Sequence, residues 1–272
     1  MTVLRAHSAS CAHCPVGLQR ATCHIECLQS LERILVEHGR EIAAVIVEPL
    51  LQGAGGMIVH PEEFLSGVRR LTAAHDVLLI ADEVLTGFGR TGRMFACERA
   101  AVVPDLMCVA KGLTGGFLPL AATFATGRIH DAFAGEDRTR AFFHGHSYTA
   151  NPIACAAANA SLQIFQTEPV FERIAAIEKV HLARLPAFAA HPCVADVRHI
   201  GSVAAIEFEV PDSGYLSSLR PQLYEFYLRR GVLLRPLGNV VYILPPYVIT
   251  PEQVNHVYDA IRDSLAMVSQ SA

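Results

Sequence analysis

Short apolar runs alternate with amphipathic segments along the first part of the chain. Residues 42–47, 77–81 and 106–110 are apolar throughout, which is typical of strands that are buried on both faces of a parallel sheet. Apolar side chains at helical spacing predict helices over 25–38 and 61–75, each of which precedes one of these strands. Because strands alternate with helices, the pattern predicts an α/β fold with a mainly parallel sheet.

The pattern changes after Thr167. A helix that opens at Asn151-Pro152 and runs to residue 165 closes the first part of the chain. Beyond it we expect a C-terminal α+β subdomain with helices over 170–188, 222–230 and 250–265 and short strands over 194–200, 203–210, 232–235 and 240–244. Three parts follow from this: a Cys-rich lead-in with its helix (1–40), a large domain (41–166) and a small domain (167–272).

Composition and charge favour a small-molecule enzyme. The chain has 272 residues, of which 51% are hydrophobic and 18% charged, and its net charge of −4 offers no basic surface for nucleic acid or anionic lipid. No apolar stretch approaches the roughly 20 residues that a membrane-spanning helix needs. The first residues contain no apolar core of a signal peptide, so we expect a cytoplasmic location.

Four of the 8 cysteines are clustered near the N-terminus. Cys11, Cys14, Cys23 and Cys27 form the pattern C-x2-C-x8-C-x3-C. Two alternatives stay open for it. Close Cys pairs are able to share one metal ion, but the central gap is shorter than in most zinc ribbons, which favours a reduced or oxidation-prone loop. At the ends of the three apolar runs, where the sequence predicts a site, we expect no metal ion.

Three predicted strands end in an ionisable side chain: Glu48, Asp82 and Lys111. In an open parallel sheet, ligands bind at the carboxyl ends of the strands. The three side chains therefore predict either a partly buried ion pair or a pyridoxal phosphate site. In the second alternative the lysine forms an imine with the cofactor and an aspartate pairs with the pyridinium nitrogen. Burial at a strand end would favour the neutral amine that an imine-forming lysine needs.

Two sequence segments favour the second alternative. Residues 80–92, IADEVLTGFGRTG, together with VAKG at 109–112, resemble the class III aminotransferases of fold type I. The resemblance implies that Asp82 holds the pyridinium nitrogen and that Val84 packs against one face of the cofactor ring. Lys111 would be the imine-forming lysine and the proton shuttle. Glu48, in VEPLLQGAGG, matches an acidic residue on the substrate side.

Two further segments resemble that family. Residues 143–158, FHGHSYTANPIACAAA, are similar to the segment that lends a hydroxyl to the cofactor phosphate of the neighbouring subunit, which implies a homodimer. Ser147 falls at that hydroxyl position, and the resemblance adds Gly145 to the substrate-binding residues; a plain turn before a helix is the alternative. Residues 231–250 resemble the biotin-pathway members, in which an arginine, here Arg235, binds the substrate carboxylate. The alternative for Arg235 is a surface residue without this role.

The resemblance implies amino-group transfer from S-adenosylmethionine to 8-amino-7-oxononanoate in biotin biosynthesis. It runs from Cys14 to the last helix, and the family's N-terminal portion has no counterpart in residues 1–40. We therefore expect the chain to correspond to the C-terminal two thirds of such an enzyme. Two alternatives remain open: an aminotransferase for another substrate, such as an ω-amino acid, and a non-catalytic truncated or partner subunit.

Overall fold

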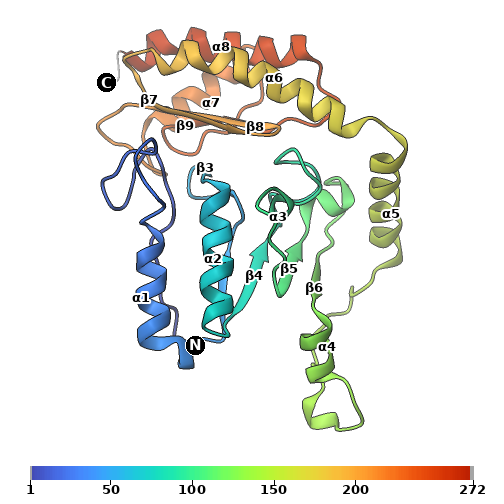
Figure 1. The fold of residues 1–272 in the computed structure, drawn as a ribbon. Coiled ribbons are helices and arrows are strands. Elements are labelled where there is room, and N and C mark those ends of the chain that lie inside the picture. The colour runs from blue at the N-terminus through green and yellow to red at the C-terminus, as the bar shows by residue number, and fades with distance from the viewer. Residues whose placement is uncertain (1, 270–272) are drawn as a thin grey trace. The chain divides into compact units, whose positions relative to one another are not determined.

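The computed structural model describes residues 2–269, which form two compact units (Figure 1). Each unit is discontinuous in sequence. The first unit comprises the residues up to Leu50, His60–Phe88 and Met94–Glu168, and the second comprises Leu51–Val59, Gly89–Arg93 and the residues from Pro169 onward. The three-part division expected from the sequence stays a prediction.

A four-stranded sheet organises the first unit. Its strands are β1 (Ala44–Val47), β4 (Leu78–Asp82), β5 (Leu106–Val109) and β6 (Ala122–Ala125), in the order β1-β4-β5-β6. The first three strands are parallel, and β6 pairs antiparallel with β5. The mainly parallel sheet predicted from the apolar runs is confirmed, while the antiparallel edge strand β6 carries no such run and was not predicted.

The helices of the first unit are α1 (Leu28–His38), α2 (Glu62–Ala74), α3 (Ala96–Arg99), α4 (Gly127–Phe133) and α5 (Pro152–Thr167), with short 3-10 helices η1 (Gly39–Glu41), η2 (Lys111–Thr114) and η3 (Arg138–Arg140). Three of them, α1, α2 and α5, lie where the sequence predicts helices, while α3 and α4 are additional. Helices α1 and α2 lie side by side (Figure 1). Gly67 permits this approach because a Cβ there would overlap Leu28 Cδ1. The predicted start of α1 at Ile25 was wrong, since Ile25 has a φ of 65°, which no right-handed helix accepts.

Burial on both strand faces was predicted for all three apolar runs, and this was wrong for β1 and β5. Ile46 of β1 is 65% exposed, and Leu106, Met107 and Cys108 of β5 are only half-buried. β4 meets the prediction on one face only, since its side chains alternate between buried and half-buried. A strand is fully buried only where chain covers both faces of the sheet, and the described residues cover the faces of β1 and β5 only in part.

The second unit combines an antiparallel sheet with three helices. Its elements are the strands β2 (Leu51–Gln52), β3 (Ile58–Val59), β7 (Val194–Ile200), β8 (Val203–Phe208) and β9 (Val240–Ile243) and the helices α6 (Val170–Ala189), α7 (Leu219–Arg229) and α8 (Pro251–Ser269). Strands β7, β8 and β9 form one sheet in that order. The strand predicted at 232–235 was wrong: the N–H of Leu234 donates to the carbonyl of Val232 in a local turn instead of joining a ladder.

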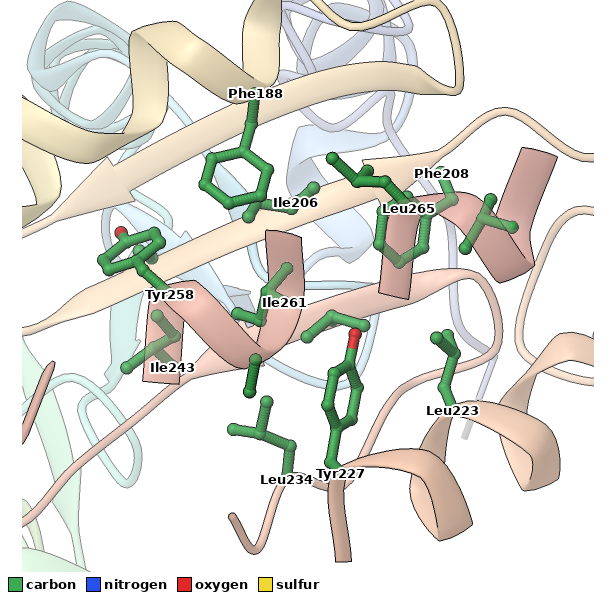
Figure 2. Close-up of a cluster of buried hydrophobic side chains, with 14 of the residues drawn as sticks. Phe188, Ile206, Phe208, Leu223, Tyr227, Leu234, Ile243, Tyr258, Ile261 and Leu265 are labelled. Atoms are coloured by element: carbon green, nitrogen blue, oxygen red, sulfur yellow. The ribbon is translucent and has the colours of Figure 1, made fainter. Parts of the chain in front are cut away.

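A hydrophobic cluster forms the core of the second unit (Figure 2). Side chains from all three helices and from the sheet meet there, among them Phe188, Phe208, Tyr227, Tyr258 and Ile261. The last helix begins with a reciprocal cap. Thr250 N–H donates to Gln253 Oε1 at 2.9 Å, and Gln253 N–H donates back to Thr250 Oγ1 at 3.3 Å.

Among residues 2–269, no helix combines the length and the apolar character that crossing a bilayer requires. The cytoplasmic location stays a prediction.

Candidate active site

The carboxyl ends of three parallel strands bring the predicted ionisable residues to one edge of the first unit's sheet. Val47 of β1 pairs with Ala81 of β4, so Glu48 follows its strand directly beside Asp82. Asp82 in turn pairs with Cys108 of β5, three residues before Lys111. The common register confirms the expectation that Glu48, Asp82 and Lys111 follow neighbouring strands at the same edge.

Asp82 is half-buried at the last position of β4, and its two carboxylate oxygens differ. Oδ1 accepts a hydrogen bond from the N–H of Val84 at 3.1 Å, which fixes the orientation of the carboxylate. Oδ2 makes no hydrogen bond to any part of the chain from residue 2 to residue 269. An aspartate held in this way is able to accept one hydrogen bond from a ligand without losing its own support.

Lys111 is exposed, which corrects the expectation of a buried amine. Strand β5 already ends at Val109, and Lys111 opens the short helix η2, so its side chain is not inside the sheet. Its φ of 35° lies in the left-handed region. Helix α5 supports η2, because Ser161 Oγ donates to the carbonyl of Gly112 at 3.4 Å. The lysine therefore stands on a supported turn.

A buried histidine holds the backbone next to Glu48. His60 is 3% exposed, and its Nε2 lies 3.1 Å from the carbonyl oxygen of Glu48. Burial lowers the pKa of His60, so the neutral ring with a hydrogen on Nε2 fits this contact. The side chain of Glu48 is half-buried. Sequence reasoning missed His60, since a single histidine before a helix carries no pattern of its own.

Gly145 and Ser147 lie in an exposed turn before α5. Within residues 2–269, no hydrogen bond joins either residue to Asp82 or Lys111. Asn151 caps α5, where its Oδ1 accepts from Ile153 N–H at 3.0 Å. The helix start is therefore capped from within the chain.

Arg235 belongs to the second unit and is exposed, between the buried residues Leu234 and Pro236. Its guanidinium makes no ion pair or hydrogen bond within the described part of the chain. A guanidinium in this state is able to bind a carboxylate with its two parallel N–H groups.

Two residues of the segment 80–92 have contacts that the sequence patterns did not indicate. Glu83 is fully buried, and its carboxylate accepts three hydrogen bonds. In the second unit, the guanidinium of Arg90 lies 4.7 Å from the ring centre of Tyr247 and donates to the carbonyl of Pro245 at 2.6 Å. Glu83 is the second of two carboxylates directly after the apolar run 77–81, so the sequence does place it near the site. The sequence alone does not separate its role from that of Asp82.

The four N-terminal cysteines line one small pocket of the first unit. Burial raises the pKa of the Cys27 thiol, and the neighbouring thiols of Cys14, Cys23 and Cys11 raise it further. Among the described residues, no three His, Cys, Asp or Glu side chains are arranged to bind a metal ion. The thiols therefore lie near one another without converging on a common point, and the two alternatives for this cluster stay open.

Comparison with known proteins identifies the family. Residues 4–265 match the class III aminotransferases. A curated relative from Geobacter sulfurreducens, called adenosylmethionine-8-amino-7-oxononanoate aminotransferase, is 44% identical over 277 residues, which cover 98% of this chain and 60% of the relative. A curated omega-aminotransferase of Caulobacter vibrioides is 40% identical over 240 residues, which cover 88% of this chain and 54% of the relative.

A solved structure gives the same result for the fold. The crystal structure of an amine transaminase from an uncultivated Pseudomonas species, in a form with bound pyridoxal phosphate, has a TM-score of 0.82 and 35% identity over 89% of this chain and 56% of that one. The predicted fold type I architecture is thereby confirmed. The chain spans between half and two thirds of the length of the curated relatives that it matches. Over the length that it shares with them, it belongs to the class III aminotransferases.

Proposed function

We propose that this chain carries the lysine and the ring-binding aspartate of an aminotransferase that uses pyridoxal 5'-phosphate. The observation that supports this most is the common edge at which Glu48, Asp82 and Lys111 follow three adjacent parallel strands. The residues fit the cofactor, because Asp82 Oδ2 is able to accept a hydrogen bond and the exposed Lys111 amine is able to react.

The proposed roles rest on the chemistry of the residues and on the resemblance to the class III aminotransferases. When bound, the cofactor supplies the electron sink for amino-group transfer. Asp82 would accept the hydrogen of the ring nitrogen and keep that nitrogen protonated. Lys111 would hold the cofactor through its Nζ and would move a proton at that atom. By resemblance to the class III aminotransferases, Val84 would contact the cofactor ring and Ser147 would donate its hydroxyl to the phosphate in the neighbouring subunit.

We propose S-adenosylmethionine as amino donor and 8-amino-7-oxononanoate as acceptor, in biotin biosynthesis. The name of the Geobacter sulfurreducens relative supports this pair of substrates. Arg235 would bind the substrate carboxylate, while Glu48 and Gly145 would lie on the substrate side. The Caulobacter vibrioides relative supports an ω-amino acid as the alternative substrate.

A spectroscopic titration tests the proposal. The purified chain mixed with pyridoxal phosphate is expected to develop a visible absorption band, and S-adenosylmethionine is expected to bleach it within one turnover. Ornithine and 4-aminobutyrate serve as control donors and are expected to leave the band unchanged. A band that 4-aminobutyrate bleaches and S-adenosylmethionine does not would favour the alternative substrate. A chain that develops no band would contradict the catalytic proposal and favour a non-catalytic subunit.

We also propose that the chain works as a homodimer, with Ser147 facing the partner's cofactor. Large apolar side chains are exposed on both sides of Ser147, and Phe143 is 87% exposed. Exposed aromatic side chains of this kind are typical of the core of a protein interface. Phe142, Tyr148 and Ile153 continue the same exposed segment.

Replacing Phe143 by glutamate is therefore expected to weaken dimerisation about 30-fold, because a carboxylate would have to lose its water at the interface. Light scattering across a dilution series measures the change. Leu216→Glu is the matched control, since Leu216 is equally exposed but belongs to the second unit. Equal dimer dissociation constants for Phe143→Glu and wild type would place the interface elsewhere.

A further inference from the structure

The carboxylate of Glu83 joins the two ends of the loop that follows Asp82. Its Oε2 accepts from Thr86 Oγ1 at 2.5 Å and from Ala96 N–H at 3.1 Å, and its Oε1 accepts from Cys97 N–H at 2.8 Å. The side chain is 0% exposed. A carboxylate that is removed from water is costly unless such donors surround it. Burial of the Glu83 carboxylate therefore costs desolvation free energy, which these hydrogen bonds offset.

A tight turn connects Glu83 to Phe88. Gly87 N–H donates to the carbonyl of Glu83 at 2.9 Å, and a Cβ on Gly87 would come within 2.8 Å of that same oxygen. Phe88 follows with a φ of 58° and is 4% exposed, and its ring packs edge-on against Phe95 at 5.6 Å between ring centres. The position of Phe88 is thus fixed from both sides.

Phe88 packs directly on the backbone that bears Lys111. A Cβ added to Gly112 would lie 2.8 Å from Phe88 Cβ and 3.0 Å from Phe88 Cδ2. Real Cβ atoms do not approach so closely, so only glycine permits this contact. Gly112 immediately follows Lys111, whose own φ is positive. The buried side chain of Phe88 therefore braces the turn from which the lysine projects.

We propose that Glu83 is a positioning residue for both proposed cofactor-binding residues. It directly follows Asp82 in the chain, and through the loop and the Phe88–Gly112 contact it sets the position of Lys111. The inference rests on the proposed function, since it concerns how the same site is held in shape. No atom of Glu83 is assigned to the cofactor or the substrate.

The Glu83→Gln variant tests the inference. An amide of the same shape keeps one acceptor oxygen but points an NH2 group at an N–H donor, so the loop loses a partner. We expect the dissociation constant of pyridoxal phosphate to rise about 10-fold. We also expect the pH midpoint of the visible band to rise by about half a unit, because a less well-placed Asp82 leaves the ring nitrogen less protonated. A purely structural role would not move this midpoint.

Glu98→Gln is the matched control. Glu98 lies on α3, the short helix that contains the donors Ala96 and Cys97, and within residues 2–269 its exposed carboxylate accepts only from Phe95 N–H, at 2.9 Å. Its cofactor affinity and pH midpoint are expected to equal those of the wild type. Should Glu83→Gln fail to fold, Thr86→Val removes one of the three donors and is expected to shift both readouts in the same direction, while Thr86→Ser, which keeps the hydroxyl, restores them.

A double-mutant cycle tests the contact between Phe88 and Gly112. Gly112→Ala alone is expected to weaken cofactor binding about 10-fold. Phe88→Gly removes the atoms that the new methyl group would meet and suits the positive φ, so the double variant is expected to bind better than the sum of the two changes allows. Additive effects in the cycle, or a Glu83→Gln protein with the cofactor affinity and pH midpoint of the wild type, would overturn the role of Glu83 and leave the proposed function intact. A wild-type protein without the visible band would overturn the proposed function together with this role.

Discussion

Replacing Lys111 by alanine is expected to abolish the visible band of bound pyridoxal phosphate and to lower the transamination rate about 10³-fold or more. The variant loses both the amine that would hold the cofactor and the group that would move the proton, and a positioned acid–base group alone contributes about 10² to 10⁴ in rate. Lys111 is exposed on a turn, so the change removes no packed side chain. Circular dichroism is expected to show an unchanged fold.

The low number of lysines in the chain provides a control for the role of Lys111. Lys111 and Lys179 are the only lysines among the 272 residues. Lys179 is exposed on α6 of the second unit, so Lys179→Ala is expected to keep the band. Borohydride reduction of the wild-type complex is expected to leave a pyridoxyl group on the peptide with Lys111. A label on Lys179 instead, or a band that persists in Lys111→Ala, would contradict the assignment of the lysine.

The edge at which the site forms was predictable, because it depends on apolar runs and ionisable residues that are local in sequence. Continuous apolar runs locate β1, β4 and β5, and each run is followed within two residues by Glu48, Asp82 or Lys111. Parallel pairing then places these residues at one edge whatever the details of packing. The strands β2 and β3 were missed because two residues carry no detectable period, and the edge strand β6 was missed because Thr123 interrupts its apolar residues.

Burial was the property that sequence patterns misjudged. Apolar residues at 106–110 predict a buried strand end, yet Lys111 is exposed because the chain turns into η2 at that position. Conversely, the charged residue Glu83 is fully buried, because donors from Thr86, Ala96 and Cys97 surround it. Each outcome depends on contacts that the residue types alone do not specify.

Acidification is expected to destabilise the second unit through His181. This residue is 0% exposed on α6, and burial lowers its pKa from 6.5 to about 4. Between these two values the unfolded chain binds a proton that the folded chain excludes, so the stability is complete above pH 6.5 and falls as the pH decreases. At about 1.4 kcal/mol per unit, the loss reaches about 3 kcal/mol near pH 4. Hydrogen exchange in peptides of α6 and α8 measures it.

The hydrogen bonds of His181 allow burial and the hydrogen bond with Tyr258 to be tested separately as causes of its lowered pKa. Nε2 lies 3.3 Å from the Ser202 carbonyl, which only accepts, so the neutral ring carries its hydrogen there and Nδ1 accepts from Tyr258 Oη at 2.8 Å. Tyr258→Phe removes that donor and is expected to cost about 1 kcal/mol at neutral pH while the pH dependence persists. His181→Gln is expected to abolish this component of the pH dependence. If the free energy of unfolding of His181→Gln still fell on acidification as in the wild type, another group would cause the acid sensitivity. Desolvation of the His181 imidazole would then contribute nothing.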